Sequence, residues 1–159
     1  MNPENPFTPP KADVADVPDT TPGSPIKAVL FGFLTDFGGS MLAGIPFAFI
    51  YGVLLSVSGI PADEVGQALT EMPPDSLYAV IGYGIGLAFS MLGGFVCARI
   101  AKRNEYVLAA VAATLSALSG LLVMPPGYSH ELIALLTILS YTGAIYGAKR
   151  GIDKNRRGL

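Results

Sequence analysis

One acid, Asp36, lies inside a long apolar stretch of this 159-residue sequence, and Arg99 ends the next such stretch. A carboxylate within a membrane is costly unless it is paired, hydrated or neutralised, so Asp36 is the first candidate for chemistry. Two counts of its depth disagree. From Lys27 it lies about 13 Å into a helix, close to the middle of a bilayer, whereas from Gly59 it lies about 34 Å away, at the far boundary. On the second count Asp36 meets Arg99, so we predict either an ion pair of these two residues or a proton or cation site.

The other residue types that could do chemistry are isolated in the sequence. Cys97 is the one cysteine, so it has no companion in the chain for a disulfide or a metal site. His130 stands beside Glu131, and these two ligands fall short of the about four that structural zinc needs. The glycine-rich run at residues 82–86 lies within an apolar stretch, not between a strand and a helix. We therefore expect no enzyme, no catalytic residue, no cofactor and no metal.

The composition predicts a membrane protein. The sequence is 51% hydrophobic and 14% charged, whereas a soluble domain carries about 25% charged residues. Its apolar residues form blocks at about 28–58, 78–98, 106–124 and 132–148, and about 20 such residues span a bilayer core. A soluble protein would need polar helix faces, which the last two blocks lack. We predict an all-α, four-helix transmembrane bundle over residues 27–150.

The basic residues indicate how the spans are oriented. With four spans, all ten Lys and Arg residues fall on one side of the membrane, and the two loops on the other side have none. Cytoplasmic loops collect Lys and Arg, so both termini are predicted to be cytoplasmic: a disordered, proline-rich tail over residues 1–26 and a basic tail over 151–159. The basic C-terminal end either enforces this topology or contacts the anionic inner leaflet. It has no aromatic residue, which argues against nucleic-acid binding.

The first block is too long for a single straight span. Its length of about 46 Å exceeds a bilayer core of about 30 Å, so it either tilts or begins along the interface. Pro46 lies inside it and predicts a kink, because proline lacks a backbone donor. In the following acidic loop, Val65, Ala68, Leu69 and Met72 recur at helical spacing. This pattern predicts a short amphipathic helix on the outer surface.

Small side chains recur every fourth residue in the apolar blocks. Helices in lipid associate by close packing, and rows of small residues let their backbones approach. Such a row drifts around the helix, so it serves two neighbours or serves one neighbour over part of its length. We expect surplus small surface to bind a second copy or a larger membrane complex, besides the lipid bilayer itself. The residues predicted to pack helices are Gly82, Gly86, Ser90, Gly94 and Ala98 of the second span, and Ser40 and Gly44 of the first.

Two short segments carry a resemblance to known proteins. Residues 92–101 read Leu-Gly-Gly-Phe-Val-Cys-Ala-Arg-Ile-Ala, and the N-terminal tail contains Asn5-Pro6-Phe7. The first segment resembles the Gly-Gly-x-x-x-Ala-Arg-Ile end of the second helix in small uncharacterised four-span bacterial inner-membrane proteins. The tail is similar to the Asn-Pro-Phe/Tyr tails that precede their spans. The resemblance implies a multi-pass protein of the bacterial inner membrane and transfers no activity to any residue.

Two functions remain open from the sequence. The first is a small non-enzymatic scaffold or accessory subunit that works through helix packing. The alternative is a small oligomeric transporter or channel that uses Asp36 as a proton or cation site. A transporter needs several polar groups along one route, and the sequence offers few at membrane depth beyond Asp36, Thr137, Ser140, Tyr141 and Thr142.

Overall fold

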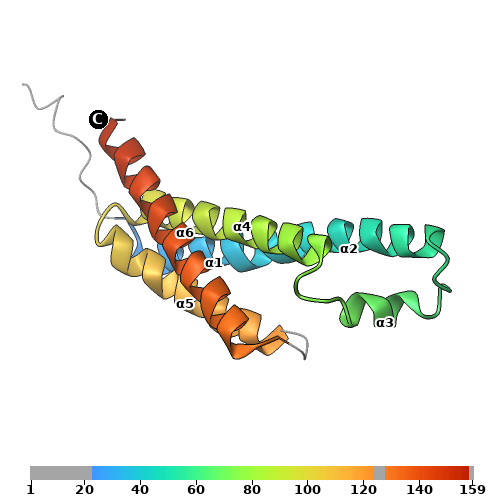
Figure 1. The fold of residues 1–159 in the computed structure, drawn as a ribbon. Coiled ribbons are helices and arrows are strands. Elements are labelled where there is room, and N and C mark those ends of the chain that lie inside the picture. Colours follow the sequence, from blue (N-terminus) through green and yellow to red (C-terminus); the bar gives the residue numbers. More distant parts are fainter. Residues whose placement is uncertain (1–22, 124–127, 158–159) are drawn as a thin grey trace, which may run out of the picture.

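The computed structural model describes residues 23–123 and 128–157, and within these ranges the chain is helical and has no strand (Figure 1). Turns join the helices in the described part. The elements in order are α1 (Pro25–Phe33), η2 (Leu34–Gly38), α2 (Gly39–Val57), α3 (Val65–Thr70), α4 (Leu77–Ala101), α5 (Glu105–Val123) and α6 (His130–Arg157).

Four helices are long and apolar enough to cross a membrane. They are the continuous helix Pro25–Val57, made of α1, η2 and α2, together with α4, α5 and α6. The predicted all-α class and four helices long and apolar enough to be spans are thereby confirmed. The helix Pro25–Val57 has 33 residues, which corresponds to about 50 Å and exceeds a bilayer core.

The first span starts earlier than predicted and contains a π-helical turn that the sequence does not predict. Ser24 caps it by accepting a hydrogen bond from the Lys27 backbone N–H at 3.4 Å, and Pro25 occupies its first turn. Pro46 lies inside α2, which continues past it, so the predicted kink there stays a prediction. Separately, residues Leu34–Gly38 form a π-helical turn. Hydropathy and proline positions carry no signal for such a turn.

The last span continues beyond its predicted end. The apolar block stops near residue 148, but α6 runs on to Arg157, so most of the predicted basic tail is part of this helix. Gly151 and Ile152 are buried, and the Asn155 Nδ2 atom donates a hydrogen bond to the Ala98 carbonyl at 3.1 Å. These contacts with α4 explain why the helix persists where the sequence turns polar.

The loop between the first two long helices contains the short helix α3, as the spacing predicts, although it has only six residues. Its Val65 and Leu69 side chains face Gly52 of α2. Ser76 then caps α4 by accepting a hydrogen bond from the Ala79 backbone N–H at 3.2 Å. In Figure 1, α3 folds back beside the far end of α2.

Helix α4 is the central element of the described chain, because it contacts α1, η2, α2, α5 and α6. Helices α5 and α6 contact each other, whereas α2 contacts α4, α3 and η2 but neither α5 nor α6. In Figure 1 the helices converge near the start of α1, and α2 with α4 then diverges from the pair α5 and α6. The described part of the bundle is therefore closed at one end and splayed at the other.

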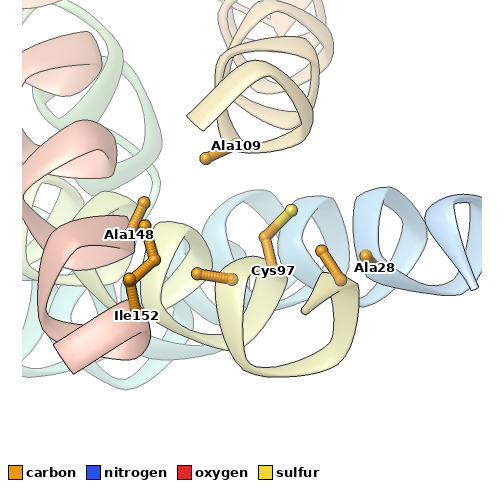
Figure 2. Close-up of a cluster of buried hydrophobic side chains, with 7 residues drawn as sticks. Ala28, Cys97, Ala109, Ala148 and Ile152 are labelled. Atoms are coloured by element: carbon orange, nitrogen blue, oxygen red, sulfur yellow. The ribbon is translucent and has the colours of Figure 1, made fainter. Parts of the chain in front are cut away.

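The closed end holds the hydrophobic core, which is built from small side chains (Figure 2). The largest fully buried side chain of the described residues is Cys97. Small residues allow neighbouring backbones to approach, which is how helices gain contact in lipid. The core cluster comprises Ala28, Cys97, Ala98, Ala101, Ala109, Ala148 and Ile152.

Glycines set the closest helix contacts. A Cβ atom on Gly94 of α4 would collide with the Ala144 carbonyl of α6, and one on Gly147 of α6 would collide with the Met91 carbonyl of α4. On the other side of α4, a Cβ on Gly93 would lie 2.7 Å from the Gly32 carbonyl oxygen of α1. Adjacent glycines of α4 therefore bring two different helices into backbone contact.

The predicted packing rows are used along part of their length. Ser90, Gly94 and Ala98 are buried in α4, whereas Gly82 and Gly86 are half-buried. A Cβ atom placed on Gly86, or on Gly44 of α2, would have no atom of another helix within 4 Å. The division follows from the splay, because these glycines lie beyond the level where the helices converge.

Replacing Gly94 with alanine tests the α4–α6 contact. We expect Gly94→Ala to lower the free energy of unfolding by about 1–3 kcal/mol, because the new methyl group meets backbone that cannot move aside. Gly84→Ala is the matched control, since a Cβ there meets nothing within 4 Å. It should be neutral or stabilising, because alanine favours helix over glycine by about 1 kcal/mol. The midpoint of SDS-induced unfolding in mixed micelles measures both, and equal midpoints would contradict the proposed contact.

Candidate functional site

Asp36 lies in the π-helical turn of the first long helix. Its backbone carbonyl accepts a hydrogen bond from the Ser40 hydroxyl at 2.6 Å, which ties the turn to the start of α2. Phe33 precedes Asp36 in the sequence and Phe37 follows it, and the rings of these two residues stack on each other with centroids 5.5 Å apart. Single π-helical turns are rare and are concentrated at functional sites. This one coincides with the one acid of the apolar stretch.

The Asp36 side chain is buried and points at α4. It is 7% exposed, and its Oδ1 atom accepts a hydrogen bond from the Ser90 hydroxyl at 2.9 Å. A Cβ atom on Gly93 would lie 2.7 Å from the Asp36 Cβ. Glycine at position 93 therefore leaves the space that the carboxyl group needs to reach α4.

The structure places Asp36 deep in the bundle. The Gly23 backbone N–H donates a hydrogen bond to the Ala101 carbonyl at 3.1 Å, so α1 begins at the level where α4 ends. Asp36 lies about 16 Å further along its helix, and Ser90 lies a similar distance back along α4. Measured from the end of α4, Asp36 therefore lies about as deep in the bundle as the count from Lys27 suggests.

Arg99 is not brought to Asp36. The two helices are antiparallel, and Arg99 lies about 13 Å along α4 from Ser90, towards the closed end. Its side chain is exposed, whereas Asp36 is buried. The predicted ion pair would need Asp36 at the boundary, and the early start of the first helix at Pro25 moves the acid inwards. Ser90, which the sequence suggested only as a packing residue, is the partner instead.

A cavity of about 220 Å³ adjoins the carboxyl group, which is room for several water molecules. Its wall on one side is apolar, with Met41, Leu121 and Ile133 extending towards the splayed end. Every long helix contributes to it. Its polar lining residues are Asp36, Ser40, Ser90, Ser116, Thr137 and Ser140.

Two of the hydroxyl groups of this cavity present acceptor lone pairs to it. Ser40 donates its proton to the Asp36 carbonyl, and Thr137 donates its proton to the Ile133 carbonyl at 2.8 Å. A hydroxyl has one proton, so what remains on these oxygens is lone pairs. Ser116 adjoins the Asp36 carboxyl group, yet its buried Oγ atom has no hydrogen-bond partner of good geometry among the described residues. The cavity therefore offers one acid and several neutral oxygens.

Basic side chains do not balance Asp36. Every Lys and Arg of the described residues is exposed, and none of them lines the cavity. The same part of the chain contains no group of three or more His, Cys, Asp or Glu residues that could hold a metal. Cys97 is a buried free thiol in the core, and His130 is exposed at the start of α6. The Asp36 carboxyl group and the surrounding hydroxyl groups are therefore the groups of this site that could bind a ligand.

The sequence contained a signal for this site that the packing rows obscured. Ser40 and Ser90 belong to rows of small residues, and Ser116 lies in a similar row of α5. A serine fits between helices as glycine or alanine does, but it also brings an oxygen. The polar members of the rows, rather than their glycines, mark the cavity.

Comparison of the chain with protein-family models, curated proteins and solved structures finds no match. The resemblance to small four-span bacterial proteins therefore stays a prediction.

The hydrogen bond between Ser90 and Asp36 can be tested by stability. We expect Ser90→Ala to lower the free energy of unfolding by about 1 kcal/mol, since it leaves a buried acceptor unpaired. Asp36→Asn should stay close to the native protein, because the amide oxygen still accepts from Ser90. Ser119→Ala, on α5 but outside the cavity lining, serves as the control. SDS-induced unfolding followed by circular dichroism gives the midpoints, and equal effects of Ser90→Ala and Ser119→Ala would argue against the bond.

Proposed function

We propose that this chain is a small membrane protein that binds a proton or a monovalent cation at Asp36 as part of ion transport. The observation that carries the proposal is the convergence of Asp36 with hydroxyl groups of all the long helices on one cavity. Ionisable residues buried in the membrane mark ion pathways and proton relays. The sequence alone offered few polar groups along one route, and the cavity supplies that set.

Charge balance supports a cationic ligand. An isolated buried carboxylate is costly, and the exposed Lys and Arg side chains of the described residues leave it without a basic partner. A single positive charge, either a proton on the carboxyl group or an alkali-metal ion, removes this cost. Carboxylate and hydroxyl oxygens are suitable ligands for hard cations, so both forms of neutralisation suit this lining.

The shape of the bundle supports access from the splayed end. The cavity lining runs from Asp36 to Leu121 and Ile133, which lie near the ends of α5 and α6 that adjoin residues 124–129. On the opposite side, Gly32 and Cys97 approach closely, and the small-residue core follows. A ligand at Asp36 would therefore exchange with the side of the membrane at which the helices splay.

The charge pattern supports an orientation with both termini in the cytoplasm of a bacterial inner membrane. The described Lys and Arg residues lie at the start of α1, the end of α4, the following turn and the end of α6. The antiparallel order of the spans puts these positions on one side. The splayed end would then face away from the cytoplasm.

A second candidate function is a scaffold or accessory subunit. Helix α2 supports it, because none of its 19 residues is buried in the described structure. A Cβ on Gly44 would meet nothing within 4 Å, so a small-residue surface on this helix is free to approach another helix.

Asp36→Asn tests the cation site. In buffers of constant ionic strength, the unfolding midpoint of the native protein should rise when sodium replaces choline, or should depend on pH if the ligand is a proton. The native protein should also carry sodium or proton flux into proteoliposomes loaded with a sodium- or pH-sensitive dye. Asp36→Asn should lose both responses while folding normally, and Ser119→Ala should keep them.

The same experiment separates the two candidates. If Asp36→Asn responds to cations and carries flux as the native protein does, the proposed ion site is refuted. In that case, capture of a defined membrane complex by the gently solubilised native protein would support the accessory role, and a monodisperse monomer would refute it as well.

The orientation is tested by cysteine labelling. Cys97→Ala provides a cysteine-free chain, and single cysteines at Asp63 and at Lys102 report on the two sides. In intact spheroplasts, an impermeant maleimide should label position 63 and spare position 102, because the membrane shields the cytoplasmic face. The reverse pattern would overturn the orientation.

A further inference from the structure

The end of α6 is a fixed part of the bundle rather than a free tail. Ala148, Gly151 and Ile152 are buried, and a Cβ on Gly151 would lie 2.8 Å from the Phe95 carbonyl oxygen of α4. The Asn155 side chain caps the same helix by its hydrogen bond to Ala98. The extension from Lys149 to Arg157 therefore has a defined orientation against α4.

This orientation gathers basic side chains on the outward face. Residues 148, 151, 152 and 155 face α4, so positions 150 and 157 lie on the opposite side of the helix, and position 154 lies on its flank beside Phe95 of α4. These are Arg150, Lys154 and Arg157, which are all exposed. From Lys149 to Arg157 the sequence has five basic residues against one acid, Asp153. We name Arg150, Lys154 and Arg157 the basic face.

Two members of the basic face are held beside aromatic rings at the end of the apolar spans. Arg150 donates hydrogen bonds to the Tyr146 hydroxyl from Nη2 at 2.7 Å and from Nε at 3.1 Å. The Lys154 ammonium lies 6.0 Å from the centre of the Phe95 ring. Tyr146 is 44% exposed, as suits a tyrosine at a membrane interface. These contacts hold the two positive charges beside aromatic side chains next to the apolar spans.

The neighbouring end of α4 reinforces the positive field. Arg99, Lys102 and Arg103 are exposed there, and the contacts of Gly151 and Asn155 with α4 place this end beside the α6 extension. Clusters of basic residues next to a span attract anionic lipids, because each charge adds to the attraction by the negative leaflet. A rigid helix also loses little conformational entropy when it binds.

We propose that the basic face binds the headgroups of anionic phospholipids in the adjoining leaflet. The occupant is a lipid rather than a soluble phosphate, because the charges lie beside aromatic side chains at the edge of the apolar spans. This site is separate from Asp36, and neither proposal depends on the other. Its expected consequence is an anionic lipid shell around the junction of α4 and α6.

Native mass spectrometry of the full chain tests the proposal. The protein is released from vesicles of phosphatidylcholine with a minor fraction of phosphatidylglycerol, and the retained lipids are counted. Phosphatidylglycerol should be enriched on the native protein by about tenfold over the vesicle composition. The variant R150Q/K154Q/R157Q should lose most of this enrichment, whereas R150K/K154R/R157K should keep it because it keeps the charges.

Two further readouts make the result decisive. The unfolding midpoint of each variant in mixed micelles shows whether the fold is intact, and an intact glutamine variant that has lost the enrichment supports the proposal. Equal enrichment in the native and glutamine variants, or no enrichment in the native protein, overturns it. Loss of phosphatidylglycerol on addition of inorganic phosphate at constant ionic strength also overturns it, since the face would then be a soluble-phosphate site.

Discussion

The structure depends on backbone contact at two adjacent glycines of α4. Gly93 faces Gly32 of α1, and Gly94 faces Ala144 of α6. Helices in lipid gain little from hydrophobic burial, because lipid tails are as apolar as leucine, so van der Waals contact must hold the bundle together. Neighbouring residues of a helix point about 100° apart, which lets one pair of glycines join two partners. The small-residue core at the closed end extends the same contact.

The candidate site follows from this packing. Where α1 touches α4 at Gly93, the next turn of the first long helix must lie against Ser90, and that turn carries Asp36. Beyond this level the contact of α2 with α5 and α6 is absent in the described chain, so the space between them becomes a cavity. The acid thus lies at the apex of the splay, where close packing stops. A polar group there can reach both a helix partner and a ligand.

Much of the fold was predictable from the sequence, because length, hydropathy and charge act locally. The four long apolar helices and the helix in the acidic loop follow from such patterns. The π-helical turn and the end of α6 were not predictable, since both depend on contacts with α4. For the same reason the sequence suggested an ion pair of Asp36 and Arg99. The depth of Asp36 in the bundle depends on where its helix begins relative to the neighbouring helix α4. The start at Pro25, level with Ala101, sets that depth.

The splay of the helices also helps to decide whether Asp36 only holds helices together or binds a ligand. A structural buried acid is normally held by a basic partner or by several donors, because removing a charge from water is costly. Here the Ser90 hydroxyl donates to the carboxyl group and the Ser116 hydroxyl adjoins it, while Ser40 and Thr137 direct their protons to backbone carbonyls. The exposed basic residues of the described chain lie near its ends, away from the cavity. In the proposed cation site, neutralisation comes from what enters the cavity, so the state of Asp36 follows the solution at the splayed end. That dependence favours a site that responds to protons or cations over one that only holds helices together.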